Sequence, residues 1–214
     1  MDLFGREKAR LLQAVKEDQV HDDPRLEYAD YVEKKGQHDL ARFIRIQCHR
    51  EAIGDRYPSE EETSLQAHHP EWQYPFTQKI DEIPGLLTFV GPLCFRRGFA
   101  DGATLMAAEF LRHARKLKKR HPLITEFAIF GVRQDLLETL KRPELRMARK
   151  LCLAPTDFIV PPDQSLTDAD MPTIASCPHL SELRNLTIMS GMLNMRPITD
   201  VGATAFGATA KLPH

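Results

Sequence analysis

The clearest constraint on the fold is an internal repeat in the second half of the chain. A proline followed by apolar residues at fixed offsets occurs twice, 35 residues apart. The two copies are Pro143, Leu145, Ala148, Leu151 and Leu153, and Pro178, Leu180, Leu183, Leu186 and Ile188. A shorter copy consists of Ile124, Phe127 and Ile129. Each copy ends with apolar residues two positions apart, the period of a strand with one buried face, so the repeat predicts parallel strands in adjacent coils.

A second pattern marks where a helix is expected in each repeat. The motif Leu166-Thr167-Asp168 precedes Leu180 by the same spacing as Ile198-Thr199-Asp200 precedes Leu212. A short strand, a turn and a helix that begins near Leu/Ile-Thr-Asp together resemble a leucine-rich repeat. The resemblance implies a solenoid in which strand residues point alternately inward and outward, and helices close the far side of the core.

The repeat is irregular. The spacing is 24 residues from Phe127 to Leu151 and 35 residues from Leu151 to Leu186, whereas leucine-rich repeats span about 20–29 residues. Pro161-Pro162 and residues 191–195 are expected to form enlarged turns. Because the sequence ends where the next strand would begin, we interpret residues 122–214 as a short, truncated or decaying solenoid.

The sequence of the N-terminal region (residues 1–57) predicts three helices, which span residues 7–17, 24–35 and 39–53. Apolar residues recur at helical spacing in each, and Gly36 is a natural C-terminal stop for the second. We expect the second and third helices to form an antiparallel hairpin. The side chains expected to be buried between them are Leu26, Ala29, Val32, Phe43 and Ile44.

Two acidic residues of this region have expected structural roles. Asp23 precedes Pro24 and is expected to cap the second helix, because its carboxylate can accept free backbone N–H groups. Asp30 is expected to form an ion pair with Arg42 or Arg45 on the third helix.

The segment from Asp22 to Gly36, with sequence DDPRLEYADYVEKKG, resembles the signature of the bacterial repeat-companion domain. The continuation Ala41–Gln47 is similar to the closing helix of that domain. This sequence has Tyr31 where the family has tryptophan, and Arg42 where the family has an acidic residue. The resemblance implies a domain that precedes leucine-rich repeats and has no assigned activity, so it carries over no catalytic residue.

Residues 58–121 connect these two regions and contain adjacent segments of opposite charge. Residues 58–92 hold six acidic residues and one basic residue, and residues 93–121 hold eight basic and two acidic residues. The segment Phe95–Phe99 is expected to form a strand that turns at Gly98. Its aromatic residue followed by Arg-Gly-Phe is similar to the segment that leads into the repeats in the repeat-companion family. Residues 107–120 predict a helix.

This helix ends in a basic stretch. Six of the nine residues from Arg112 to Arg120 are Lys or Arg, and cations near a helix C-terminus stabilise the helix dipole. The alternative is contact with phosphate or nucleic acid, through Arg96, Arg97, Arg115, Lys116, Lys118, Lys119 and Arg120. No aromatic, Asn or Gln side chain interleaves the basic residues of the stretch, so reading of bases is not supported.

The sequence offers no convincing catalytic or metal site. His68, His69 and Glu71 cluster, but adjacent histidines point in different directions and Pro70 interrupts the helix, so we expect a solvated corner with Trp72 packed inward. GxSxG, HExxH and phosphate-binding glycine loops do not occur. The four cysteines, Cys48, Cys94, Cys152 and Cys177, form no CxxC pair, which favours reduced thiols in the cytoplasm over disulfides or zinc.

These patterns predict an α/β protein with a three-helix unit at 1–57, a connecting segment at 58–121 and a leucine-rich-repeat-like solenoid with parallel strands at 122–214. A hydrophobic content of 42% excludes a disordered chain, and no run of about 18 apolar residues predicts a membrane span. Residues 1–8 lack the apolar stretch of a signal peptide, so a cytoplasmic location is expected. The expected function is non-enzymatic binding of a protein partner, without a cofactor, on the strand surface where Cys152 and Thr187 point outward.

Overall fold

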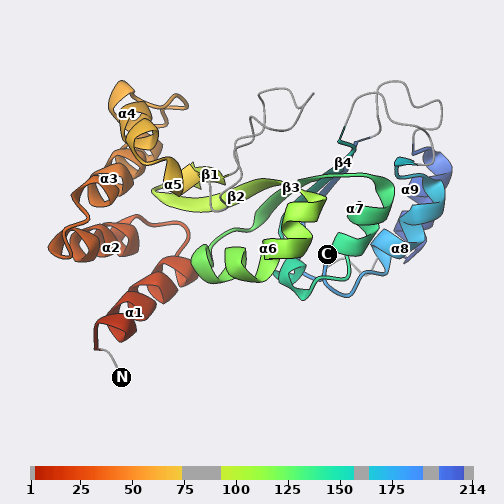
Figure 1. Ribbon diagram of the computed structural model, residues 1–214, viewed down its shortest axis with the longest axis horizontal. Helices are drawn as coiled ribbons and strands as arrows, with labels where there is room; N and C mark the ends of the chain where they lie inside the picture. Colours follow the sequence, from red (N-terminus) through yellow and green to blue (C-terminus); the bar gives the residue numbers. More distant parts are fainter. Residues whose placement is uncertain (1–2, 74–92, 157–163, 190–197, 210–214) are drawn as a thin grey trace. The chain divides into compact units, whose positions relative to one another are not determined.

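The computed structural model describes residues 3–73, 93–156, 164–189 and 198–209 (Figure 1). Its contacts divide the chain into two compact units. The first comprises Met1–Tyr74 and Phe95–Ala100, and the second comprises Pro75–Cys94 and Asp101–His214. These boundaries differ from those expected after residues 57 and 121. The helix at 107–120 belongs with the repeat-like region because Phe110 packs edge-on against Phe127, with ring centroids 5.7 Å apart.

The first unit is helical. Its helices are α1 (Leu3–Glu17), α2 (Asp23–Lys34), α3 (His38–Ala52), α4 (Glu60–His68) and α5 (Pro70–Gln73). The three expected helices are therefore confirmed. Gly36, at φ +79°, follows the end of α2 in the left-handed conformation that glycine adopts without strain.

The buried stripe of α2 begins one residue earlier than expected. Leu26 is 37% exposed, so the prediction that it is buried is wrong, whereas Arg25 is only 7% exposed. Arg25, Tyr28, Ala29 and Val32 form the i, i+3, i+4, i+7 stripe and are all buried. On α3, Phe43 and Ile44 are fully buried, as expected.

The N-terminal end of α2 also differs from the expectation. The capping position is Asp22, not Asp23, and the Asp22 side chain makes no capping hydrogen bond. The prediction for Asp30 is confirmed with Arg45, at 2.6 Å, and Arg45 also pairs with Glu33 at 2.7 Å. Arg42 pairs instead with Glu61 of α4.

Two arginines that are far apart in the sequence hold the loop between α1 and α2. Arg25 and Arg97 each donate to main-chain carbonyls of this loop. Arg25 bonds the oxygens of Asp18 and His21 at 3.0 and 2.7 Å, and Arg97 bonds those of Gln19 and Val20 at 3.2 and 2.5 Å. The loop carbonyls thus obtain donors that the helices cannot supply.

Gly98 lies against the backbone of α3. It lies at φ +81°, and a Cβ at this position would stand 2.5 Å from the Cα of Ile44. Its N–H donates to the side-chain oxygen of Gln47 at 2.6 Å, and Gln47 in turn donates to Glu62 at 2.7 Å. The turn expected at this glycine is therefore confirmed.

A five-stranded sheet follows, with strand order β1-β2-β3-β4-β5. The strands are β1 (Leu93–Arg96), β2 (Phe99–Met106), β3 (Glu126–Phe130), β4 (Lys150–Ala154) and β5 (Asn185–Ile188). Strands β2 to β5 pair in parallel. The mixed α/β class and the parallel strands of the sequence prediction are confirmed.

The register is also the one that the repeat predicts. Leu151 lies opposite Leu186 and Leu153 opposite Ile188, and Phe127 lies opposite Leu151. Leu151 and Leu153 are fully buried, as expected, but Leu186 and Ile188 are only half-buried. The reason is that β5 is the last strand in the sheet order, and only β4 pairs with it among the described strands.

The sheet contains one copy of the repeat that sequence inspection missed. On β2, Ala103 lies opposite Phe127 and Leu105 lies opposite Ile129. Both β2 residues are buried, and each precedes its partner on β3 by the spacing that separates Phe127 from Leu151. The copy was missed because alanine is too small to stand out in an apolar pattern.

The helices of the second unit follow the strands in chain order, and Figure 1 shows α6 and α7 beside β3 and β4. They are α6 (Ala107–Arg120), α7 (Arg133–Thr139), the 3-10 segments η2 (Pro143–Met147) and η4 (Asp168–Asp170), α8 (Met171–Ala175) and α9 (Asp200–Thr209). The helix starts expected after Leu166 and Ile198 are confirmed.

The two Thr-Asp motifs are joined directly. The carboxylate of Asp168 accepts hydrogen bonds from the N–H of Thr199 at 2.8 Å and from its hydroxyl at 2.5 Å. Arg133 of α7 donates two hydrogen bonds to the buried carboxylate of Asp170, at 2.6 and 2.8 Å. The enlarged turns expected at Pro161-Pro162 and at residues 191–195 lie outside the described residues. Among the helices that the structure describes, none combines the length and the apolar character needed to cross a membrane.

The first prediction tests the core of the helical unit. Phe43→Ala should lower the free energy of unfolding by about 3–5 kcal/mol, because it leaves a cavity at a fully buried site. Leu26→Ala is the matched control and should cost less than about 1 kcal/mol, since Leu26 is exposed. Denaturant melts of both variants measure the difference, and equal losses would contradict the assignment.

Candidate functional site

The outward side of the sheet carries three rows of side chains, which we call the strand face. Because residues alternate along a strand, those between the buried positions point to the opposite side. The parallel register aligns them across strands β2 to β5. The first row is Gly102, Glu126, Lys150 and Asn185, the second is Thr104, Ala128, Cys152 and Thr187, and the third is Met106, Phe130 and Ala154.

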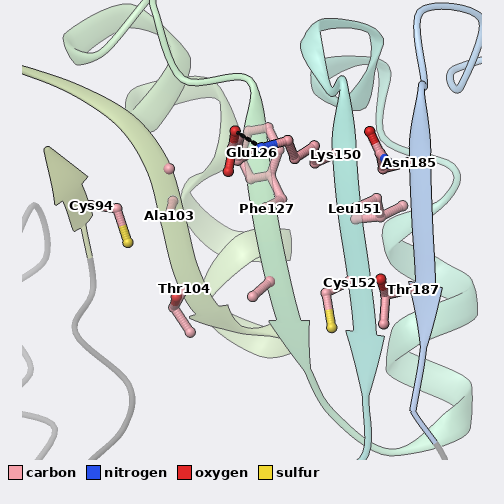
Figure 2. Close-up of a pocket in the computed structure, with 12 residues that line it drawn as sticks. Cys94, Ala103, Thr104, Glu126, Phe127, Lys150, Leu151, Cys152, Asn185 and Thr187 are labelled. Carbon is pink, nitrogen blue, oxygen red and sulfur yellow. Dashed lines mark ion pairs between the residues drawn. The ribbon is translucent and has the colours of Figure 1, made fainter. Parts of the chain in front are cut away.

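A pocket of about 380 Å³ lies on the strand face, and every described residue that lines it belongs to one of the five strands. Figure 2 shows Cys152 and Thr187 next to one another on β4 and β5. Thr187 is exposed and Cys152 is half-buried. The structure therefore brings together the two residues that the sequence singled out for partner binding.

Gly102 of β2 allows a close contact with β1 in the lining of the pocket. A Cβ on this residue would lie 3.1 Å from the Cβ of Cys94, which is closer than ordinary van der Waals contact. Glycine thus lets Cys94 lie against the neighbouring strand. Sequence inspection missed both residues as part of the site, because the pairing of β1 with β2 brings Cys94 there.

The first row contains the charge of the strand face. The ammonium group of Lys150 lies 2.5 Å from a carboxylate oxygen of Glu126, and both side chains are about half exposed. A dashed line in Figure 2 marks this ion pair. An exposed pair of this kind contributes little to stability. It gives the first row one acid and one base in a fixed order, with the amide of Asn185 beside them.

The two thiols of the pocket are held in their neutral form. Burial raises the pKa of Cys152. Partial burial of the sulfur, followed by the nearby charges of Asp101 and Glu126, raises the pKa of Cys94. A nucleophilic cysteine needs a lowered pKa and an adjacent base, and the described lining residues include no histidine.

The basic residues considered as one patch belong to different units. Arg96 pairs with Glu51, and the Arg97 side chain, only 17% exposed, lies 3.3 Å from Asp22 besides bonding the α1–α2 loop. Both are engaged within the first unit. The remaining members, Arg115, Lys116, Lys118, Lys119 and Arg120, lie on α6 in the second unit.

His69 of the histidine cluster is held in place by ion pairs and by ring stacking. His69 lies between two carboxylates, 2.9 Å from Asp39 and 2.8 Å from Glu71, and its ring stacks on Trp72 at 4.2 Å. Trp72 packs on Phe43, with ring centroids 5.1 Å apart, in agreement with the inward packing expected for it. In the described part of the chain, no three His, Cys, Asp or Glu residues are placed to hold a metal ion.

Comparison with known proteins assigns no family to this chain: no family model, curated protein or solved structure shows a significant match.

The second prediction concerns the charge of His69. Both ring nitrogens face carboxylates. Only the protonated ring can donate a hydrogen bond to each of the two carboxylates, because the neutral ring has a single N–H group. The hydrogen bonds to Asp39 and Glu71 accordingly raise the pKa of His69 above its usual 6.5. The stabilisation is complete below pH 6.5 and is lost as pH rises through the raised value. Trp72, the single tryptophan, should report this loss as a fluorescence transition above pH 6.5.

His69→Gln should abolish the transition, and His68→Gln should keep it, because His68 bonds the carbonyl of Ser64 instead. A transition at or below pH 6.5, or one that persists in His69→Gln, would contradict the assignment.

Proposed function

We propose that this protein is a non-enzymatic interaction module that binds a protein partner on the strand face. In this proposal the helical unit is a repeat-companion domain and the sheet with its helices is a short leucine-rich-repeat-like solenoid. The observation that carries it is the pocket whose described lining comes from all five strands. In a solenoid, the aligned strands form the extended binding surface.

The three rows of the strand face offer three different contacts. The middle row is small and uncharged, so a partner can approach the backbone closely at Ala128 and Cys152. The first row offers the Glu126–Lys150 pair, and the third row offers the apolar side chains of Met106 and Phe130. A partner that meets all three rows gains a charged, a close-packed and an apolar contact, the combination found in specific interfaces.

The dimensions of the strand face favour a short segment of a partner protein. Four strands about 4.8 Å apart and three rows about 6.8 Å apart cover roughly 200 Å². A stable interface between folded proteins needs about 800 Å² on each partner. An extended segment of about four residues spans the same distance of about 14 Å. We therefore infer that the partner inserts a short peptide segment into the pocket.

An enzymatic role has less support. The thiols of Cys94 and Cys152 are kept neutral, and the carboxylate of Glu126 is engaged by Lys150. A catalytic site needs an activated nucleophile or a free acid–base pair. The pocket offers these groups as contacts for a partner instead.

The third prediction tests the strand face. Thr187→Arg places a long charged side chain in the pocket and should abolish partner binding, with stability nearly unchanged because Thr187 is exposed. Thr173→Arg, at an exposed position of α8, is the matched control. Immobilised wild-type and variant chains are compared by quantitative mass spectrometry of the proteins that each retains from a lysate of the native host. At least one protein should be retained by the wild type and Thr173→Arg and lost with Thr187→Arg, and identical retention by all three would overturn the proposal.

A further inference from the structure

The second half of α6 carries four cations that have no acidic partner in the part of the chain that the structure describes. Arg115, Lys116, Lys118 and Lys119 are exposed, and no described Asp or Glu forms an ion pair with any of them. Arg112, earlier on the same helix, pairs with Glu109 at 3.6 Å. We call these four residues the α6 cation face.

The α6 cation face lies away from the core of its unit. Phe110, Ala114 and Leu117 are buried and form one side of the helix. At about 100° per residue, Arg115, Lys116 and Lys119 lie on the opposite side, with Lys118 at its edge. The buried residues hold the helix in place, so the four cations are presented on a rigid support.

Stabilisation of the helix dipole explains only part of this arrangement. The dipole effect is confined to the last turn, which contains Lys118 and Lys119 but neither Arg115 nor Lys116. Like charges three or four residues apart destabilise a helix, and Arg115 and Lys116 each form such a pair with Lys119. The helix therefore carries repulsion that an anionic partner would relieve.

We propose that the α6 cation face binds the sugar-phosphate backbone of nucleic acid without sequence preference. From Arg115 to Lys119 the helix rises about 6 Å, the length over which the two strands of B-DNA together present about four phosphates. The face has no Asn, Gln or aromatic side chain to read bases. An anionic membrane is a poorer partner, because the large apolar residues of α6 are not among the exposed ones and none can insert into lipid.

Salt-dependent binding of a 20-base-pair DNA duplex tests this proposal. Fluorescence anisotropy with the full chain, between about 20 and 200 mM KCl, should give a log–log slope of about −3.6 for four phosphate contacts. Two duplexes of unrelated sequence should bind with equal affinity. Replacement of Arg115, Lys116, Lys118 and Lys119 by Gln should abolish binding and its salt dependence.

The matched control replaces four other exposed lysines by Gln, which changes the net charge equally: Lys8, Lys16, Lys34 and Lys141. It should bind as the wild type does, and so should Thr187→Arg, because the proposal is independent of the strand face. The absence of duplex binding, retention of binding by the fourfold α6 variant, a tenfold preference for one sequence, or binding only to phosphatidylserine vesicles would each overturn the proposal.

Discussion

Burial of apolar side chains in a shared register is the interaction on which the second unit depends. Phe127 lies opposite Leu151 and Ile129 opposite Leu153, and all four are buried. Because side chains alternate along a strand, a slip by one residue would expose this entire set. The same register therefore decides which residues point outward, and the composition of the strand face is a consequence of how the core is built.

In the first unit, hydrogen bonds to main-chain groups have a comparable role. Arg25 and Arg97 supply donors to the carbonyls between α1 and α2, and the N–H of Gly98 is bonded by Gln47. These polar side chains are buried or nearly so, and unsatisfied partners at such sites are costly. Their engagement also explains why Arg97, although basic, belongs to the framework of the unit and not to a binding surface.

The two proposed surfaces differ in their physical basis. The strand face is close to neutral and combines an ion pair with small and apolar side chains. Its affinity for a partner would therefore depend mainly on shape complementarity and only weakly on the salt concentration. Binding to the α6 cation face would depend on charge, so its affinity would fall steeply as the salt concentration rises. Ionic strength therefore distinguishes the two kinds of binding in a single protein.

Local patterns in the sequence were enough to predict three helices of the first unit and the register of the repeat. The helices α1, α2 and α3, the opposition of Leu151 to Leu186 and the helix starts at the Thr-Asp motifs follow from local periodicity, which every residue of an element reinforces. The replacement of Leu26 by Arg25 in the buried stripe depends on tertiary contacts, because the loop carbonyls that bond Arg25 come from another segment. The place of Cys94 in the pocket and the lack of an acidic partner for Arg115 among the described residues have the same origin, since ion pairs and pockets depend on which distant side chains meet.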